Sequence, residues 1–157
     1  MNGPSPARLY AGVAGAVLVV LGILGFFYSA SFGRPGEVED ALGFLAVNGW
    51  VNLFHALSGA AGLLVAGFAA RRYSLYLGVL YIGIAAWGFI AGDGEAILGL
   101  IPVNSGENFL HLAIGVLGVL AAWATPEGRR RRAPGRARQK KPAKRSPPGR
   151  EAAVKSS

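Results

Sequence analysis

The stretch NGWVNLFH, residues 48–55, opens a long apolar segment and decides how the rest of the chain is interpreted. A second stretch, NSGENFLH at residues 104–111, repeats its two Asn positions and its His position at a constant offset of 56 (48 to 104). Both His of the 157-residue chain lie in these two stretches, and each stretch is followed by glycines and further apolar residues. Polar side chains therefore stand at equivalent positions inside two apolar segments.

The composition indicates a membrane protein with a basic extension. Hydrophobic residues make up 52% of the chain and charged residues only 15%, whereas soluble proteins average about 25% charged residues. The net charge of +8 arises from the last part of the chain. The absence of Cys excludes disulfides, thiolate metal ligands and Cys nucleophiles. We expect one membrane domain, residues 1–125, and one basic tail, residues 126–157.

Four apolar segments predict four membrane-spanning helices. Their expected ranges are 9–30, 49–70, 73–91 and 105–125. Each segment is close to the roughly 20 residues that cross a hydrocarbon core of about 30 Å. The expected fold class is therefore all-α, a four-helix transmembrane bundle with a disordered basic C-terminal tail.

The distribution of basic residues predicts the orientation in a cell membrane. Arg8, Arg71, Arg72 and the basic tail lie on one side of the predicted spans, whereas the loops on the other side are mostly acidic. Basic residues concentrate in cytoplasmic loops of membrane proteins. We therefore expect a multi-pass protein of the cell membrane with both termini in the cytoplasm.

The tail, residues 126–157, combines Arg and Lys with Pro, Gly, Ala and Ser. Such a composition cannot bury enough apolar surface to fold, and it predicts disorder. We expect the tail to attract anionic lipid head groups, at about 1 kcal/mol per basic residue near the bilayer surface. Its lack of aromatic residues does not favour nucleic-acid binding. A second copy of the chain or another membrane protein is left open as a partner.

The repeated stretch belongs to a longer internal duplication. Residues 36–67 align without a gap onto residues 92–123, and the first span aligns onto the third at a different offset. Matching pairs include Gly36/Gly92, Glu39/Glu95, Leu42/Leu98, Gly43/Gly99, Tyr10/Tyr73, Gly15/Gly78 and Gly25/Gly88. Each copy, about 9–70 and 73–125, contains two spans, so both copies have the same topology. This predicts two parallel two-helix repeats about a pseudo-twofold axis along the membrane normal.

Asn48 and Asn104 stand where the second and fourth spans begin. Asn is a favoured helix N-cap because its side chain accepts a hydrogen bond from a free backbone N–H. Glu107, three residues after Asn104, completes a pattern similar to a capping box, which Val51 cannot do in the first copy. We therefore predict that both Asn side chains cap helices.

The second Asn and the His of each copy fall on one helix face, because residues three apart are neighbours on a helix. At 1.5 Å per residue, each His lies about 10 Å inside its helix. Polar side chains at that depth face the bundle interior and form hydrogen bonds between helices. We therefore predict a symmetric polar seam between the repeats, made of Asn48, Asn52, His55, Asn104, Asn108 and His111.

Three interpretations of His55 and His111 are open. The first is a structural contact between helices. The second is cofactor binding, with the two His as axial ligands of a b-type haem. The third is a path for a proton or small solute, since His titrates near physiological pH.

A metal ion is not expected at this point, because a zinc site needs about four ligands and the span interiors offer only two His and some Asn. The sequence also lacks any recognised catalytic motif. We therefore expect no enzyme activity, no catalytic residues and no bound cofactor.

Several short motifs occur together over residues 9–123. They are the Gly25-Phe26 pair, Val47-Asn48 with His55 and Gly59, and the LIPVN stretch at residues 100–104 with Asn108, His111 and Gly115. In this combination they resemble the small bacterial four-span membrane proteins classified as domain of unknown function 4383. The resemblance implies a four-helix integral membrane protein and carries no established activity. We expect an integral membrane protein of structural or accessory role, with a small-solute or proton transporter or a haem-binding membrane protein as the alternative.

Overall fold

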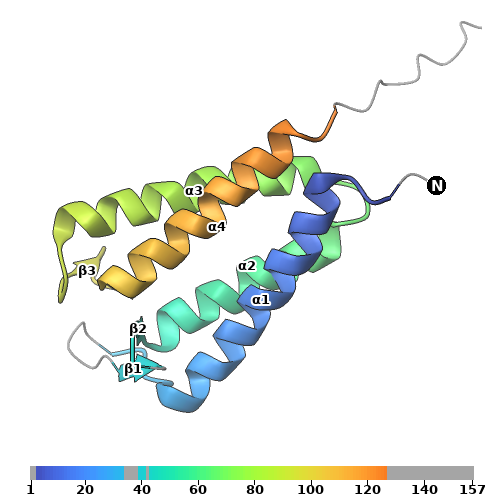
Figure 1. Cartoon of the computed structure of the whole chain (residues 1–157). Helices are drawn as coiled ribbons and strands as arrows, with labels where there is room; N and C mark the ends of the chain where they lie inside the picture. Colours follow the sequence, from blue (N-terminus) through green and yellow to red (C-terminus); the bar gives the residue numbers. More distant parts are fainter. Residues whose placement is uncertain (1–2, 34–38, 42, 127–157) are drawn as a thin grey trace, which may run out of the picture. The chain divides into compact units, whose positions relative to one another are not determined.

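The structure, a computed structural model, describes residues 3–33, 39–41 and 43–126 (Figure 1). Within these residues the chain forms four helices and two short hairpins, which confirms the predicted four-helix fold class. In chain order they are α1 (Pro6–Tyr28), β1 (Glu39–Ala41), β2 (Leu45–Val47), α2 (Gly49–Val65), α3 (Ala70–Ala91), β3 (Ala96–Ile97), β4 (Ile101–Pro102) and α4 (Ser105–Trp123). The predicted tail, from residue 127 onward, lies outside the described residues.

The two hairpins stand where the sequence analysis expected only loops. β1 pairs with β2 and β3 pairs with β4, both antiparallel. Their turns contain Gly43 and Gly99, which have φ angles of 74° and 70°. Only Gly adopts such angles without strain. The β3–β4 turn also holds Leu98 at a φ angle of 52°. The duplication therefore places a glycine at the same turn position of both hairpins.

Both predicted helix caps are confirmed. The Asn48 side chain accepts a hydrogen bond from the backbone N–H of Val51 at 2.9 Å, and it begins α2. The Asn104 side chain accepts one from the backbone N–H of Glu107 at 2.8 Å, and it begins α4. Each cap fixes the first turn of the helix that carries a His.

Close glycine contacts join α1 to α2 and α3 to α4. An added Cβ at Gly59 would lie 2.5 Å from the carbonyl oxygen of Gly15, and one at Gly78 would lie 2.8 Å from that of Gly115. Real Cβ atoms do not approach backbone atoms so closely. Small residues of this kind let membrane helices pack backbone to backbone. The described part of the chain is therefore built from two tightly packed helix pairs.

Three of the helices, α1, α3 and α4, are long and apolar enough to cross a membrane, and α2 is a shorter apolar helix of 17 residues. The chain turns after Val65, so α2 ends before the predicted limit of residue 70, and α3 already includes Arg71 in its first turn. Large apolar side chains face outward along the helices, for example Phe27 and Ile90, which are 82% and 85% exposed. A surface of this kind suits contact with lipid.

Arg8 and Arg71 bind helix ends at one end of the bundle. Arg8 Nη2 donates to the carbonyl oxygen of Gly67 at 2.6 Å, just after α2. Arg71 Nε donates to the carbonyl oxygen of Ala122 at 3.2 Å, in the last turn of α4. Cations at these positions interact favourably with the helix dipole. The two hairpins lie at the opposite end of the bundle (Figure 1).

Candidate functional site

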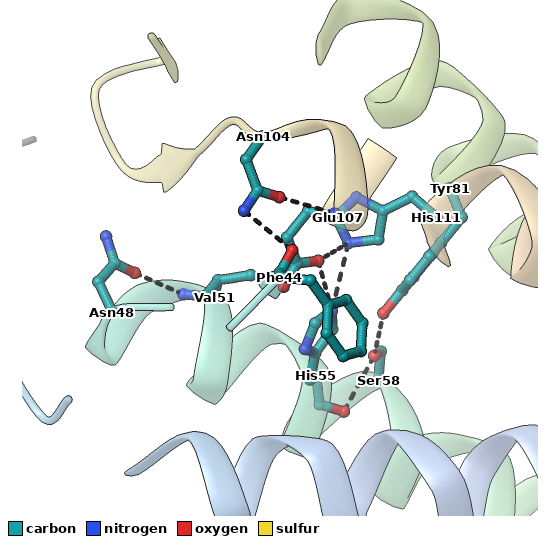
Figure 2. A network of polar contacts seen from close by, with 9 residues as sticks. All are labelled: Phe44, Asn48, Val51, His55, Ser58, Tyr81, Asn104, Glu107 and His111. Atoms are coloured by element: carbon teal, nitrogen blue, oxygen red, sulfur yellow. Dashed lines mark hydrogen bonds and ion pairs between the residues drawn. The ribbon is translucent and has the colours of Figure 1, made fainter. Parts of the chain in front are cut away.

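His55 of α2 and His111 of α4 meet at the centre of the bundle, between the two helix pairs (Figure 2). Their Nε2 atoms lie 3.2 Å apart, within hydrogen-bond distance. Both residues are buried, with exposed fractions of 2% and 1%. The repeat predicted that the two His lie at equal depth, and in the structure their imidazoles are in direct contact.

Glu107 is a third member of this centre, one helical turn before His111. Its Oε2 lies 3.3 Å from His111 Nε2 and 4.0 Å from His55 Nε2, and the residue is 1% exposed. The predicted capping box is therefore wrong, because the carboxylate turns into the core instead of back to the Asn104 N–H. The i, i+4 spacing from Glu107 to His111 was the sequence signal for this contact.

Several polar atoms of this His–Glu–His centre have no hydrogen-bond partner in the described part of the chain. Both carboxylate oxygens of Glu107 and the Nδ1 of His111 are buried and have no hydrogen-bond partner among the described residues. The 3.3 Å contact between Glu107 and His111 has the separation of an ion pair, but it does not have the direction of a hydrogen bond. A buried carboxylate without donors is costly. The centre therefore offers acceptor atoms that the described chain leaves unused.

Tyr81 of α3 covers the His pair from one side. The centroid of its ring lies 5.1 Å from that of His111 and 6.3 Å from that of His55. Its hydroxyl lies 2.9 Å from Ser58 Oγ, which itself donates to the backbone carbonyl of His55 at 3.1 Å. Tyr81 was not predicted from the sequence, because nothing in the local pattern distinguishes it from other aromatic residues of an apolar helix.

The capping Asn residues also connect the two helix pairs. Asn48 Nδ2 donates to the carbonyl oxygen of Leu100, in the β3–β4 turn, at 2.8 Å. Asn104 Nδ2 donates to the carbonyl oxygen of Phe44, in the β1–β2 turn, at 3.0 Å (Figure 2). Phe44 and Leu100 are equivalent in the duplication, so each Asn makes the same contact to the opposite copy.

Asn52 and Asn108 lie within the helix pairs and not between them. Their side chains fill the space beside Gly25 of α1 and Gly88 of α3, where a Cβ would collide with the amide groups. Asn52 Nδ2 also donates to the carbonyl oxygen of Ser29 at 2.8 Å. The six predicted seam residues are thus divided between contacts inside each pair and contacts across the pairs.

Tyr10 and Tyr73 add a further layer of contacts across the pairs. The Tyr10 hydroxyl donates to the carbonyl oxygen of Ile114 in α4 at 2.8 Å. The Tyr73 hydroxyl donates to the carbonyl oxygen of Ser58 in α2 at 2.9 Å. Ser58 and Ile114 are equivalent positions at the offset of 56 (58 to 114). The two Tyr residues are equivalent in the duplication, but their role was not predicted from the sequence.

A cavity of about 160 Å³ reaches the centre from the side of α1 and β2. His55, Glu107 and Tyr28 contribute to its wall, and the remaining lining residues are Leu21, Leu24, Gly25, Leu45 and Val47. The cavity therefore leaves room beside His55 and Glu107 for a small ligand.

His55, Glu107 and His111 are the residues of the described chain that could hold a metal ion together. The predicted haem arrangement fits the geometry poorly. Axial haem ligands lie on opposite faces of the macrocycle, whereas the two Nε2 atoms here are in direct contact.

The fold and the site together define a helical membrane protein with a buried His–Glu–His centre. A family model described as domain of unknown function (DUF4383) matches residues 8–124, and the chain belongs to this family. No curated protein and no solved structure matches the chain.

Proposed function

We propose that this chain is a non-enzymatic, multi-pass protein of the cell membrane with a structural or accessory role. Its polar interior joins two helix pairs, α1–α2 and α3–α4, into one bundle. The observation that carries the proposal is the reciprocity of the contacts across the pairs. Asn48 and Asn104 exchange contacts at the hairpin end, and Tyr10 and Tyr73 exchange contacts deeper in the bundle.

The same reciprocity supports the proposal that the two pairs are repeats about a pseudo-twofold axis. His55 and His111 are equivalent residues and contact each other at 3.2 Å, as residues beside such an axis do. Arg8 Nε and Arg71 Nε donate to the carbonyl oxygens of Ala66 and Ala122, which are again equivalent. Equivalent residues thus make equivalent contacts, within the pairs at the Arg end and between the pairs elsewhere in the bundle.

The proposed orientation places both termini in the cytoplasm. It rests on the basic residues at the end of the bundle that holds Arg8 and Arg71, and on the 12 Lys and Arg residues after position 125. Anionic lipid head groups are the proposed partner of the tail, residues 126–157, through its charge. A second copy of the chain or another membrane protein could then dock on the outward apolar face.

The joining role can be tested by removing the two Tyr hydroxyls. The double variant Tyr10→Phe/Tyr73→Phe loses one hydrogen bond to α4 and one to α2 and keeps both rings. Interhelical hydrogen bonds in membrane proteins contribute about 0.6 kcal/mol on average and at most about 1.7 kcal/mol. We expect a lower midpoint of thermal unfolding in detergent, followed by circular dichroism.

Tyr76→Phe is the matched control, because Tyr76 lies on α3 and is 70% exposed. The control should unfold at the wild-type temperature. Equal midpoints for the wild type and the double variant would show that these contacts do not join the pairs, and the proposal would fail.

The second candidate function is a path for a proton or small solute, favoured by the cavity that reaches His55 and Glu107. Against it, the Ser58 hydroxyl beside Tyr81 donates to the backbone carbonyl of His55, and a backbone carbonyl cannot pass a proton on. Proteoliposomes with a trapped pH indicator separate the two candidates. A proton flux that disappears in a His55→Ala/His111→Ala variant would replace the joining role with transport.

A further inference from the structure

The side chains of His55, Glu107 and His111 present three ligand atoms toward one point. The two Nε2 atoms and Glu107 Oε2 are separated by 3.2, 3.3 and 4.0 Å. They come from two helices, α2 and α4, whose first turns are fixed by Asn caps. The arrangement is therefore held by rigid elements (Figure 2).

These separations match the ligand spacing of a small metal ion. With bonds of about 2.0–2.1 Å in tetrahedral geometry, neighbouring ligand atoms lie about 3.3 Å apart. Two of the three separations have this value within a tenth of an ångström, and the third, from His55 Nε2 to Glu107 Oε2, is 4.0 Å. A small movement of either side chain would equalise the three distances.

The acceptor atoms without hydrogen-bond donors also support a metal site. Both carboxylate oxygens of Glu107 lack a hydrogen-bond donor among the described residues, although the side chain is fully buried. Two imidazoles whose Nε2 atoms face each other can share one proton at most, so they do not provide donors for the carboxylate as well. A cation between the three groups would neutralise the carboxylate and use both imidazole lone pairs.

We propose that His55, Glu107 and His111 bind one divalent transition-metal ion, of the kind that prefers imidazole and carboxylate ligands. Two His and one Glu form the ligand set of catalytic zinc sites that keep a fourth position open. We place the fourth position toward the cavity of about 160 Å³, because two of the three ligand residues, His55 and Glu107, line it. A water molecule or another small ligand can occupy it there. This inference concerns the same centre as the proposed joining role and extends it.

The duplication explains why the site is asymmetric. His55 and His111 are equivalent, but the residue equivalent to Glu107 is Val51, which is fully buried. A carboxylate in both copies would give four ionisable ligands and close the site. One carboxylate leaves a net charge of +1 with a divalent ion and leaves a position free.

The test is metal binding by the full-length protein in detergent. Protein stripped with a chelator is incubated with Zn²⁺, passed through a desalting column and analysed for bound metal by mass spectrometry. We expect one Zn²⁺ per chain. Co²⁺ in place of Zn²⁺ should give the visible absorption of a four-coordinate site, which reports ligation independently of affinity.

Glu107→Gln is the informative variant, since it keeps the size of the side chain and removes the charge. Removal of an outer partner of a metal ligand lowers affinity about 10–100-fold, and we expect the loss of a direct ligand to exceed this. Glu95→Gln is the matched control, because Glu95 is an exposed carboxylate next to β3. The control should bind Zn²⁺ like the wild type.

Wild-type protein that retains no more Zn²⁺ than Glu107→Gln, and gives no Co²⁺ spectrum, would overturn the metal site. That result would leave the joining role standing, since the latter is measured on metal-free protein with the Tyr variants. Conversely, normal metal binding with no effect of Tyr10→Phe/Tyr73→Phe on stability would remove the joining role and keep the metal site.

Discussion

Where the two copies of the repeat meet, they differ in one residue of the His centre, Glu107. Its counterpart Val51 is packed among apolar side chains in the same bundle. The carboxylate contacts His111 and His55 but receives no hydrogen bond from the described residues. A buried ionisable group without partners lowers stability, and membrane proteins keep such groups mainly where they have a function. The buried carboxylate without hydrogen-bond donors in the described chain therefore marks this position as a candidate functional site.

We predict that Glu107→Val stabilises the metal-free protein. The substitution places in the second copy the residue that the first copy already has, and it removes two unpaired acceptors. An unsatisfied buried polar group costs about 1–3 kcal/mol, so the unfolding free energy should rise by a part of that amount. The measurement is thermal or denaturant unfolding in detergent with a chelator present.

Glu95→Gln serves again as the control and should change nothing. Addition of Zn²⁺ should raise the unfolding temperature of the wild type and leave that of Glu107→Val unchanged. A lower unfolding temperature for metal-free Glu107→Val than for the metal-free wild type would contradict this prediction. It would mean that the carboxylate already stabilises the bundle through its contact with His111.

At the scale of the helices, glycines decide how the pairs pack. Gly78 of α3 and Gly115 of α4 lie backbone to backbone, and Gly15 and Gly59 do the same in the first pair. The backbone of a neighbouring helix cannot move aside as a flexible side chain can. The glycine positions therefore set the rotation of α2 and α4 that brings their His residues face to face.

We predict that Gly78→Ala destabilises the bundle. Its Cβ would lie 2.8 Å from both Gly115 O and Val119 N, two backbone atoms. Overpacking of this kind costs about 1–3 kcal/mol. Gly83→Ala on the same helix meets nothing within 4 Å, and should be neutral or stabilising because Ala favours helix by up to about 1 kcal/mol. Equal unfolding temperatures for the two variants would contradict the packing role of Gly78.

At the scale of the whole molecule, the ends of the bundle differ in charge. Arg8 and Arg71 bind helix ends on one side, and Asp93 stands at the hairpin end, where it accepts a hydrogen bond from Ser105 Oγ at 3.1 Å. This difference supports the proposed orientation, in which the Arg end lies in the cytoplasm, because basic residues concentrate in cytoplasmic loops.

Labelling of single Cys variants tests this orientation directly, because the natural chain has no Cys. A Cys at Ser31 or at Asp93 should react with a membrane-impermeant maleimide in intact cells. A Cys at Ser146, in the tail, should react only after the cells are opened. The reverse pattern would show that the termini lie outside.

Much of the architecture could be predicted from local patterns. The lengths of the apolar segments predicted the helices, and Asn48 and Asn104 predicted the starts of α2 and α4, because a cap acts within one helical turn. The hairpins were not predicted, since β1 to β4 are two or three residues long and carry no period. The end of α2 at Val65 was also missed, because the apolar pattern continues through the turn.

The sequence by itself determined the four helices, their caps, the glycine positions and the equivalence of His55 and His111. Tertiary structure alone decided the partners of these residues. It turned Glu107 away from the cap and toward the His pair, placed Asn52 and Asn108 within their helix pairs, and brought Tyr81 over the centre. The physical reason is that caps and spans depend on neighbours along the chain, whereas the side chains that meet between helices depend on how the glycine contacts rotate each helix.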